Sequence, residues 1–175
     1  IGWSVFGNYS WMWGRPLCGP PSAHSGDYCW GTNLTGPYIN NENSILKSPS
    51  IYIPENASEA YILFYHWFMI EDWYDSARFM IYDGRSWRIL HPIDGVNYSD
   101  VYRYGVGWTG YSGGWIVSLF DVSNYRGKTI MLGFNFTSDG SITKFGWYID
   151  DIVVAYISYE HQLKVENIIV NKFLE

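Results

Sequence analysis

The chain has 175 residues, of which 47% are hydrophobic and 20% are aromatic, and its formal net charge is −6. This length suits a single domain with a sizeable core, and a charged fraction of only 16% excludes an intrinsically disordered chain. The negative charge argues against nucleic acid as a partner and favours metal cations. No segment approaches the roughly 20 apolar residues of a membrane-spanning helix. Residues 1–4 show no signal-peptide features, so either a signal has been removed or the chain is a fragment.

Short β-strands separated by turn signals are the predicted elements, because no helical period of useful length appears in the sequence. Residues 1–44 are rich in Gly, Pro, Asn and aromatic residues and are expected to form short strands and long ordered loops. Residues 45–54 predict an edge-type strand interrupted by prolines. Residues 60–70 predict a buried strand.

A hairpin is predicted in the middle of the chain. The strand over residues 76–82 leads into Asp83-Gly84, a dipeptide typical of tight hairpin turns, and residues 87–90 are expected to pair back. Residues 91–114 are polar and glycine-rich and predict one long loop. Loops of this length are usually functional or held down by packing.

Further strands are predicted over residues 115–120, 128–137 and 145–155. With turn signals about every ten residues, the pattern indicates an all-β sandwich over residues 1–157. Residues 158–175 form a more highly charged extension without Trp or Gly, which could supply one extra strand. That strand would cap its own domain or pair with the sheet edge of a neighbour. The candidate assembly residues in it are Leu163, Val165, Ile168 and Val170.

The strand over residues 145–155 presents a burial problem. Side chains alternate along a strand, so Asp151 shares one face with Trp147 and Ile149, whereas Asp150 lies on the other face. Both faces are largely apolar, and a buried carboxylate without a partner is too costly to keep ionised. At least one of the two is therefore expected to meet a cation, several N–H donors or water.

Two features point to an extracellular protein. Cys18 and Cys29 flank a turn-rich stretch, where a disulfide would stabilise the fold by about 2–3 kcal/mol; two reduced core thiols are the alternative. Asn-x-Ser/Thr sequons are more frequent than chance predicts, and they mark surface positions in secreted proteins. These candidate glycosylation sites are Asn8, Asn33, Asn56, Asn97 and Asn135.

Several stretches occur in an order that resembles a known module. They include Trp13-Gly-Arg-Pro, Cys29-Trp-Gly-Thr-Asn-Leu, Phe64-Tyr-His-Trp, Tyr82-Asp-Gly, Phe120-Asp-Val-Ser-Asn-Tyr-Arg-Gly and Gly146-Trp-Tyr-Ile-Asp-Asp-Ile. Over roughly residues 11–155 the chain is similar to the MAM-like jelly-roll module found beside catalytic domains in secreted metalloproteases of the immune inhibitor A type. Similar modules occur in subtilisin-like proteases and in archaeal and bacterial surface proteins. The resemblance implies a jelly roll of two antiparallel sheets, usually stabilised by calcium, and implies no single activity.

Calcium takes six to eight oxygen ligands from carboxylates and carbonyls. The resemblance supports two groups of ligands, the Glu71/Asp75 cluster and the Asp150-Asp151 pair, which are expected to share one ion. The alternative is that these carboxylates cap turns and accept backbone N–H bonds. The first-rank metal candidates are Glu71, Asp72, Asp75, Asp150 and Asp151, and the second-rank ones are Asp27 and Asp139.

Catalysis is not expected. The sequence has no His-Glu-x-x-His motif, no Gly-x-Ser-x-Gly elbow and no phosphate-binding loop, and its four His show no zinc-ligand spacing. Aromatic residues of the long loop could stack on sugar rings; the alternative is that they pack onto the sandwich. They are Tyr98, Tyr102, Tyr104, Trp108 and Tyr111.

The preferred hypothesis is a non-catalytic, calcium-stabilised structural or adhesive subunit. It would assemble with like subunits or other cell-surface proteins into a filament or surface layer by strand donation. The first alternative is an accessory domain of a larger secreted protease, and the second is a module that binds glycans. All three hypotheses place the protein outside the cell or at the cell surface.

Overall fold

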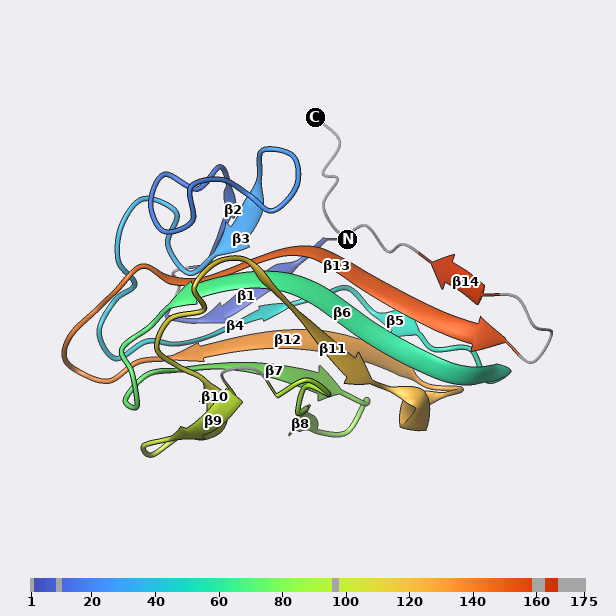
Figure 1. Cartoon of the computed structure of the whole chain (residues 1–175). Helices are drawn as coiled ribbons and strands as arrows, with labels where there is room; N and C mark the ends of the chain where they lie inside the picture. Colours follow the sequence, from blue (N-terminus) through green and yellow to red (C-terminus); the bar gives the residue numbers. More distant parts are fainter. Residues whose placement is uncertain (1, 9–10, 96–97, 159–162, 167–175) are drawn as a thin grey trace.

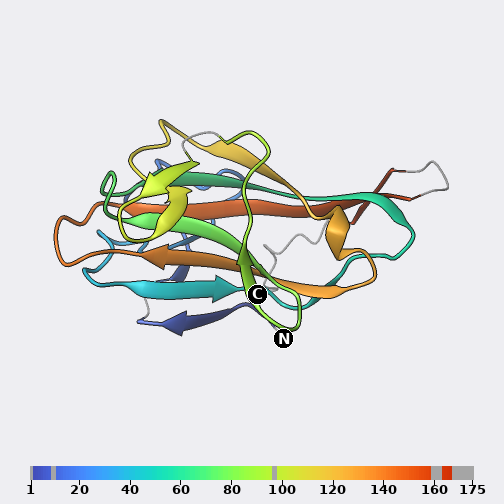
Figure 2. The same ribbon diagram turned by 90° about the horizontal axis from the view of Figure 1, so that it is seen from below.

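The computed structural model describes residues 2–8, 11–95, 98–158 and 163–166, and it contains two β-sheets packed face to face (Figure 1, Figure 2). Neighbouring strands in both sheets run antiparallel. The predicted all-β jelly roll of two antiparallel sheets is confirmed. Among the described residues, no helix has the length and apolar character needed to cross a lipid bilayer.

The first sheet has the strand order β1-β4-β12-β7-β10-β9, with β5 beside β12 and β8 beside β7. Its strands are β1 (Ser4–Gly7), β4 (Asn43–Lys47), β5 (Ile51–Tyr52), β7 (Ser76–Tyr82), β8 (Trp87–Ile89), β9 (Tyr98–Val101), β10 (Gly105–Trp108) and β12 (Thr129–Thr137).

The second sheet has the order β11-β6-β13-β3-β2, and β14 pairs with β13. Its strands are β2 (Met12–Gly14), β3 (Cys29–Gly31), β6 (Ala57–Met69), β11 (Ile116–Asp121), β13 (Gly146–Ser158) and β14 (Leu163–Glu166). One 3₁₀ turn, η1 (Ser123–Tyr125), connects β11 with β12.

Aromatic side chains fill the core between the sheets. Phe64 of β6 lies against Phe79 of β7 and Phe134 of β12, with ring centroids 5.1 Å and 5.0 Å apart. Trp108 and Trp147 are fully buried beside them, 5.6 Å from each other. Tilted and edge-on contacts of this kind contribute about 0.5–1.5 kcal/mol each beyond area burial. Much of the high aromatic content therefore serves the core.

Two strand predictions need correction. The segment over residues 45–54 is interrupted at Pro49, as predicted, and divides into β4 and β5, but β4 lies between β1 and β12 and is not an edge strand. Residues 91–114 are not one loop, since β9 and β10 form a hairpin within them.

Gly107 permits the close approach of β10 to β7, where a Cβ atom would lie 2.2 Å from the Ser76 hydroxyl.

A β-bulge in β13 changes the faces of the paired carboxylates. The register with β6 shifts between Asp150 and Val153, and Asp151 adopts a positive φ of 46°. Because of the extra residue, the next side chain after Ile149 that faces the core is that of Ile152, not that of Asp151. The expectation that Asp151 shares the core face is therefore wrong, because strict alternation stops at the bulge.

The segment between β2 and β3 covers the outer face of the second sheet at this bulge. His24 stacks on Tyr65, with ring centroids 3.6 Å apart, and its Nδ1 lies 2.6 Å from Asp151 Oδ2. Ser25 donates its hydroxyl to Asp151 Oδ1 (2.6 Å) and its backbone N–H to Asp150 Oδ2 (3.1 Å). The two carboxylates thus obtain donors from a covering loop, one of the solutions expected from the sequence.

The predicted disulfide between Cys18 and Cys29 is absent, and both residues are free thiols. The Cys18 sulfur lies 3.3 Å from the Tyr148 hydroxyl, whereas Cys29 is fully buried near Leu34. Burial raises the pKa of the Cys29 thiol to about 12, so it packs as a small apolar side chain. Cys29 is held in place because β3 pairs with β2 and β13. The turn-rich segment between the two cysteines covers the sheet and leaves their sulfurs apart.

The extra strand predicted in the C-terminal extension is β14, which pairs with β13 of its own chain. β6 occupies one edge of β13 along most of its length, while β3 pairs on the other edge only with Tyr148 and Ile149. β14 extends that second edge beside Val154–Ile157. Of the candidate assembly residues, Leu163 and Val165 belong to β14, and Ile168 and Val170 lie outside the described residues.

Candidate functional site

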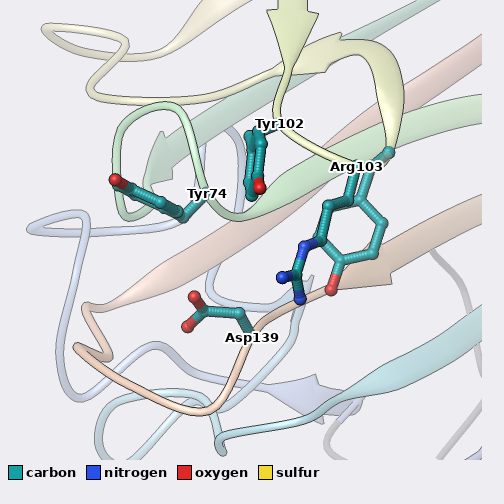
Figure 3. A pocket seen from close by; sticks show the side chains of 5 residues that line it. Tyr74, Tyr102, Arg103 and Asp139 are labelled. Atoms are coloured by element: carbon teal, nitrogen blue, oxygen red, sulfur yellow. The ribbon is translucent and has the colours of Figure 1, made fainter.

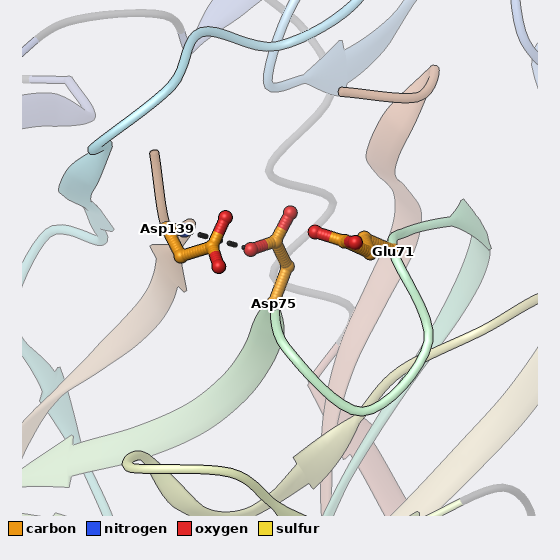
Figure 4. A group of neighbouring side chains, drawn as sticks. All are labelled: Glu71, Asp75 and Asp139. Atoms are coloured by element: carbon orange, nitrogen blue, oxygen red, sulfur yellow. Dashed lines mark hydrogen bonds between the residues drawn. The ribbon is translucent and has the colours of Figure 1, made fainter. Parts of the chain in front are cut away.

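Three carboxylates converge at one end of the sandwich (Figure 4). Glu71 follows β6, Asp75 immediately precedes β7, and Asp139 follows β12. Pairing of Ser76 with Thr137 across β7 and β12 brings the last two connections side by side. One ligand oxygen from each carboxylate lies within 4.8 Å of the other two. The strand pairing itself therefore assembles the cluster.

Hydrogen bonds hold the Asp75 carboxylate in a fixed orientation. The Tyr38 hydroxyl donates to Asp75 Oδ2 (2.5 Å) and accepts the Glu71 N–H (3.0 Å), while the Asp139 N–H donates to Asp75 Oδ1 (2.8 Å). Burial raises the pKa of Tyr38, and its bond to Asp75 raises it further, so the hydroxyl keeps its proton. These bonds connect all three carboxylate residues before any ligand is present.

Glu71 is the member of the cluster with an unsatisfied oxygen. Its side chain is buried and its Oε2 makes no hydrogen bond. Burial, followed by the charges of Asp75 and Asp139, raises the pKa of Glu71, and burial also raises the pKa of Asp75. Within the described part of the chain, no Lys, Arg or His forms an ion pair with any of the three. The donor set is all oxygen, which fits a hard cation such as calcium.

The structure does not bring Asp150 and Asp151 to this cluster. Gly146 marks the cluster end of β13, and Asp150 follows four residues later, about 13 Å along the strand. The expectation that Asp150 and Asp151 share one ion with Glu71 and Asp75 thus has no geometric support.

Two other candidates also lie away from the cluster. Asp72 is exposed and faces Gly110, where an added Cβ would lie 3.3 Å from its Oδ1. Asp27 forms a surface ion pair with Arg15 at 3.2 Å. The second-rank candidate Asp139 is the third member of the cluster.

A pocket of about 130 Å³ adjoins the carboxylates (Figure 3). It is lined by Tyr74 from the β6–β7 connection, by Tyr102, Arg103 and Tyr104 from the β9–β10 turn, and by Asp139. Asp139 therefore belongs to both the cluster and the pocket.

The aromatic residues predicted to form a loop surface separate into different environments. Trp108 is fully buried and Tyr98 packs on it at 4.9 Å, so both contribute to the core. Tyr111 is exposed and contacts Trp67. Only Tyr102 and Tyr104 line the pocket. Tyr74, which lies outside the predicted loop, was not among the candidates.

His66 has a structural environment. Trp147 donates its indole N–H to His66 Nδ1 (3.1 Å), so the proton sits on Nε2, which donates to the Ser118 hydroxyl (3.0 Å). All three side chains are fully buried. Burial lowers the pKa of His66 to about 3. This serine and histidine therefore contact no solvent-accessible substrate site.

The candidate glycosylation sites differ in their surroundings. Asn8 and Asn56 are exposed. Asn33 and Asn135 are half-buried, and their side-chain amides donate to the carbonyls of Pro37 and Ser44. Asn97 lies outside the described residues.

Two known proteases contain a region similar to this chain. Bacillopeptidase F of Bacillus subtilis (strain 168) is 37% identical over 157 residues, which cover 88% of this chain and 10% of that protein. Pre-pro-metalloprotease PrtV of Vibrio cholerae is 35% identical over 99 residues, covering 54% of this chain and 10% of PrtV. The chain thus spans about a tenth of the length of either relative. No family model matches it.

Solved structures share the fold at low sequence identity. TmCBM61 in complex with β-1,4-galactotriose superposes with a TM-score of 0.53 at 15% identity, covering 87% of this chain and 86% of that one. The K2 cleaved adhesin domain of Lys-gingipain gives 0.51 at 13%, covering 87% of each. These matches support the jelly-roll fold, and the two protease regions support the resemblance to a module of secreted proteases that the sequence motifs indicated.

Proposed function

We propose that the chain is a non-catalytic accessory module of an extracellular protease, stabilised by a calcium ion. The observation that carries the accessory role is the match to Bacillopeptidase F, which includes 88% of this chain but only 10% of the protease. Such a module would fold separately and help to place a catalytic unit. The intact native gene product is then expected to exceed 20.3 kDa and to carry a protease domain, which its mass and peptide map would establish. A native protein of this mass alone would contradict the accessory role.

Calcium is the cofactor that the carboxylate cluster supports. Glu71, Asp75 and Asp139 would hold the ion, and its charge would offset the repulsion among three carboxylates in a partly buried site. The unpartnered Oε2 of Glu71 is the observation that favours a ligand here. A bound ion would connect the β6–β7 and β12–β13 loops and stabilise that end of the sandwich.

Removal of one ligand tests the calcium proposal. Calcium at 100 times its dissociation constant stabilises a folded protein by about 2.7 kcal/mol. For a chain of this size that shift raises Tm by roughly 5–10 °C. We expect this rise in the wild type and its loss in Glu71→Gln and Asp75→Asn, measured by thermal denaturation with calcium and with EDTA.

Asp72→Asn is the matched control, because Asp72 lies in the same loop but is exposed and outside the cluster. It should keep the full calcium response. An unchanged Tm of the wild type on addition of EDTA, or an equal loss in all three variants, would contradict a calcium site at this cluster.

A glycan partner is the second candidate function, and the aromatic-lined pocket is the observation that favours it. Adhesive self-assembly through residues 163–170 stays a prediction. The pairing of β14 with its own β13 gives that strand a partner inside the module, which favours the accessory role over strand donation.

A further inference from the structure

The pocket between the β6–β7 connection and the β9–β10 turn combines two kinds of surface (Figure 3). Tyr74 and Tyr102 supply aromatic rings, and the Asp139 carboxylate and the Arg103 guanidinium supply charged groups. Pockets that enclose drug-sized ligands measure about 300–1,000 Å³. At about 130 Å³, this pocket suits one small ring, with the remainder of a longer ligand outside.

The aromatic side of the pocket is open to solvent. Tyr74 is 44% exposed and Tyr102 is 49% exposed, with their ring centroids 6.0 Å apart at an interplanar angle of 72°. The neighbouring Trp73 is 56% exposed. Three large aromatic residues exposed together at one end of a domain mark a contact surface for a ligand. A ring with an apolar face would cover them.

The polar side of the pocket restricts the charge of the ligand. Arg103 lies over the Tyr102 ring, 5.2 Å from its centroid, and so occupies the position on that ring that a cationic ligand would take. Asp139, with Glu71 and Asp75 behind it, repels an anion. The geometry thus favours an uncharged ligand.

An uncharged ligand in this pocket must accept a hydrogen bond from Arg103 and donate one to Asp139. Among the described residues, the Arg103 guanidinium makes no hydrogen bond or ion pair, so its N–H donors are available to a ligand. Carboxylates only accept; Asp139 Oδ1 already accepts the Ser141 N–H (2.9 Å) and hydroxyl (3.2 Å), so a donor on the ligand would meet Oδ2. A sugar hydroxyl both donates and accepts, and the C–H face of a pyranose ring is apolar.

The backbone around the pocket is held in unfavourable conformations. Trp73 (φ 73°), Arg103 (φ 69°) and Ile142 (φ 42°) all lie in the left-handed region that glycine prefers. Each costs about 1–2 kcal/mol, and such residues gather at binding and catalytic sites. The Tyr102 N–H donates to the Trp73 carbonyl (2.8 Å) and connects the two loops that line the pocket. Trp73 precedes Tyr74 and Arg103 follows Tyr102, so two of the strained residues lie directly beside the aromatic residues that line the pocket.

We propose that this pocket binds one uncharged pyranose residue of a glycan, packed against both Tyr74 and Tyr102 and hydrogen-bonded by Arg103 and Asp139. The proposal deepens the glycan partner proposed above and rests on it. Because Asp139 also belongs to the carboxylate cluster, a bound cation would fix its carboxylate and strengthen sugar binding.

The experiment uses immobilised neutral oligosaccharides of glucose, galactose and mannose in several linkages, with polygalacturonate and an oligolysine peptide as charged probes. The folded chain with calcium is expected to bind at least one neutral oligosaccharide. Tyr102→Ala and Arg103→Ala should each weaken that binding about tenfold or more. Tyr52→Ala is the matched control, because Tyr52 is 56% exposed but lies on β5, outside the pocket, and it should bind as the wild type does.

Folding of each variant is checked by its Tm and by its calcium response in the same buffer. Absence of binding to every neutral oligosaccharide by a folded, calcium-responsive chain would overturn the sugar site and leave the calcium proposal standing. Binding only to polygalacturonate or oligolysine, or full binding by Tyr102→Ala, would also overturn it. Sugar binding without any calcium response would support the pocket and contradict the cation at the cluster.

Discussion

The acidic residues of this chain show how burial and neighbours decide what a carboxylate does. Asp150 and Asp151 are adjacent to each other and near the middle of a strand, yet both accept hydrogen bonds from the loop that covers them. Glu71 and Asp75 occupy a sharp connection, and Glu71 keeps an oxygen without a partner. The carboxylates of Asp150 and Asp151 are therefore satisfied by neighbouring donors, whereas that of Glu71 is available for a cation.

His66 provides a pH test at the level of a single residue. Its pKa of about 3 in the folded protein lies below the roughly 6.5 of an unfolded histidine. Between these values the unfolded state binds the extra proton, so His66 lowers the free energy of unfolding as pH falls from about 6.5 toward 3. Burial is the cause, and its ring neighbours are uncharged: Phe64, Phe68, Trp108 and Trp147.

Chemical denaturation of the wild type and of His66→Gln at pH 7 and pH 4.5 measures this effect. The wild type should lose more stability than the variant between the two pH values. Glu71, Asp75 and Asp150, whose pKa values are raised by burial, act in the opposite direction in both proteins and cancel in the comparison. Equal losses would mean that His66 does not titrate as a buried neutral ring.

At the scale of elements, β13 joins the core, the covering loop and the site. Its first residue, Gly146, has φ +96° and a Cβ there would lie 2.0 Å from the Thr32 hydroxyl oxygen. Thr32 in turn accepts the Trp147 N–H through that oxygen (3.1 Å). The start of β13 is thus locked against the segment after β3.

Replacement of Gly146 by Ala should lower the free energy of unfolding by about 2 kcal/mol or more, because a Cβ forces apart two fully buried segments and strains the backbone. Urea denaturation measures the change. The control is Gly36→Ala, where the nearest atom to the new Cβ is 3.7 Å away, and it should change stability by less than about 1 kcal/mol. Equal effects of the two substitutions would contradict the close packing described for Gly146.

At the scale of the whole molecule, β14 decides whether the module is closed or open to assembly. It pairs with the part of the β13 edge that β3 leaves uncovered. A strand edge without a partner is a template for association with other chains. Pairing within the chain therefore protects the second sheet.

Truncation after residue 158 should lower Tm by several degrees and increase association, because it exposes the edge of β13. Truncation after residue 166 keeps β14 and serves as the control, which should resemble the full chain. Thermal denaturation and sedimentation velocity measure the two effects. Polymers formed by the full chain that disappear on removal of β14 would instead support strand donation between molecules.

The sequence by itself determined the fold class and most strands. Period-2 patterns and turn residues located β7, the hairpin at Asp83-Gly84, β12 and β13 closely, because these signals are local. It also pointed to Glu71 and Asp75, which lie four residues apart on one connection.

Only the tertiary structure decided the features that depend on distant segments. The bulge at Asp151 moved a carboxylate out of the core, and the pairing of β12 with β7 brought Asp139 to Glu71 and Asp75. The tertiary structure also decided that Cys18 and Cys29 stay apart as free thiols. It likewise formed the pocket, whose lining residues come from three separate connections. Local propensity specifies strands and turns, but registers, bulges and loop packing are set by the free energy of the whole assembled core, which no single stretch of sequence encodes.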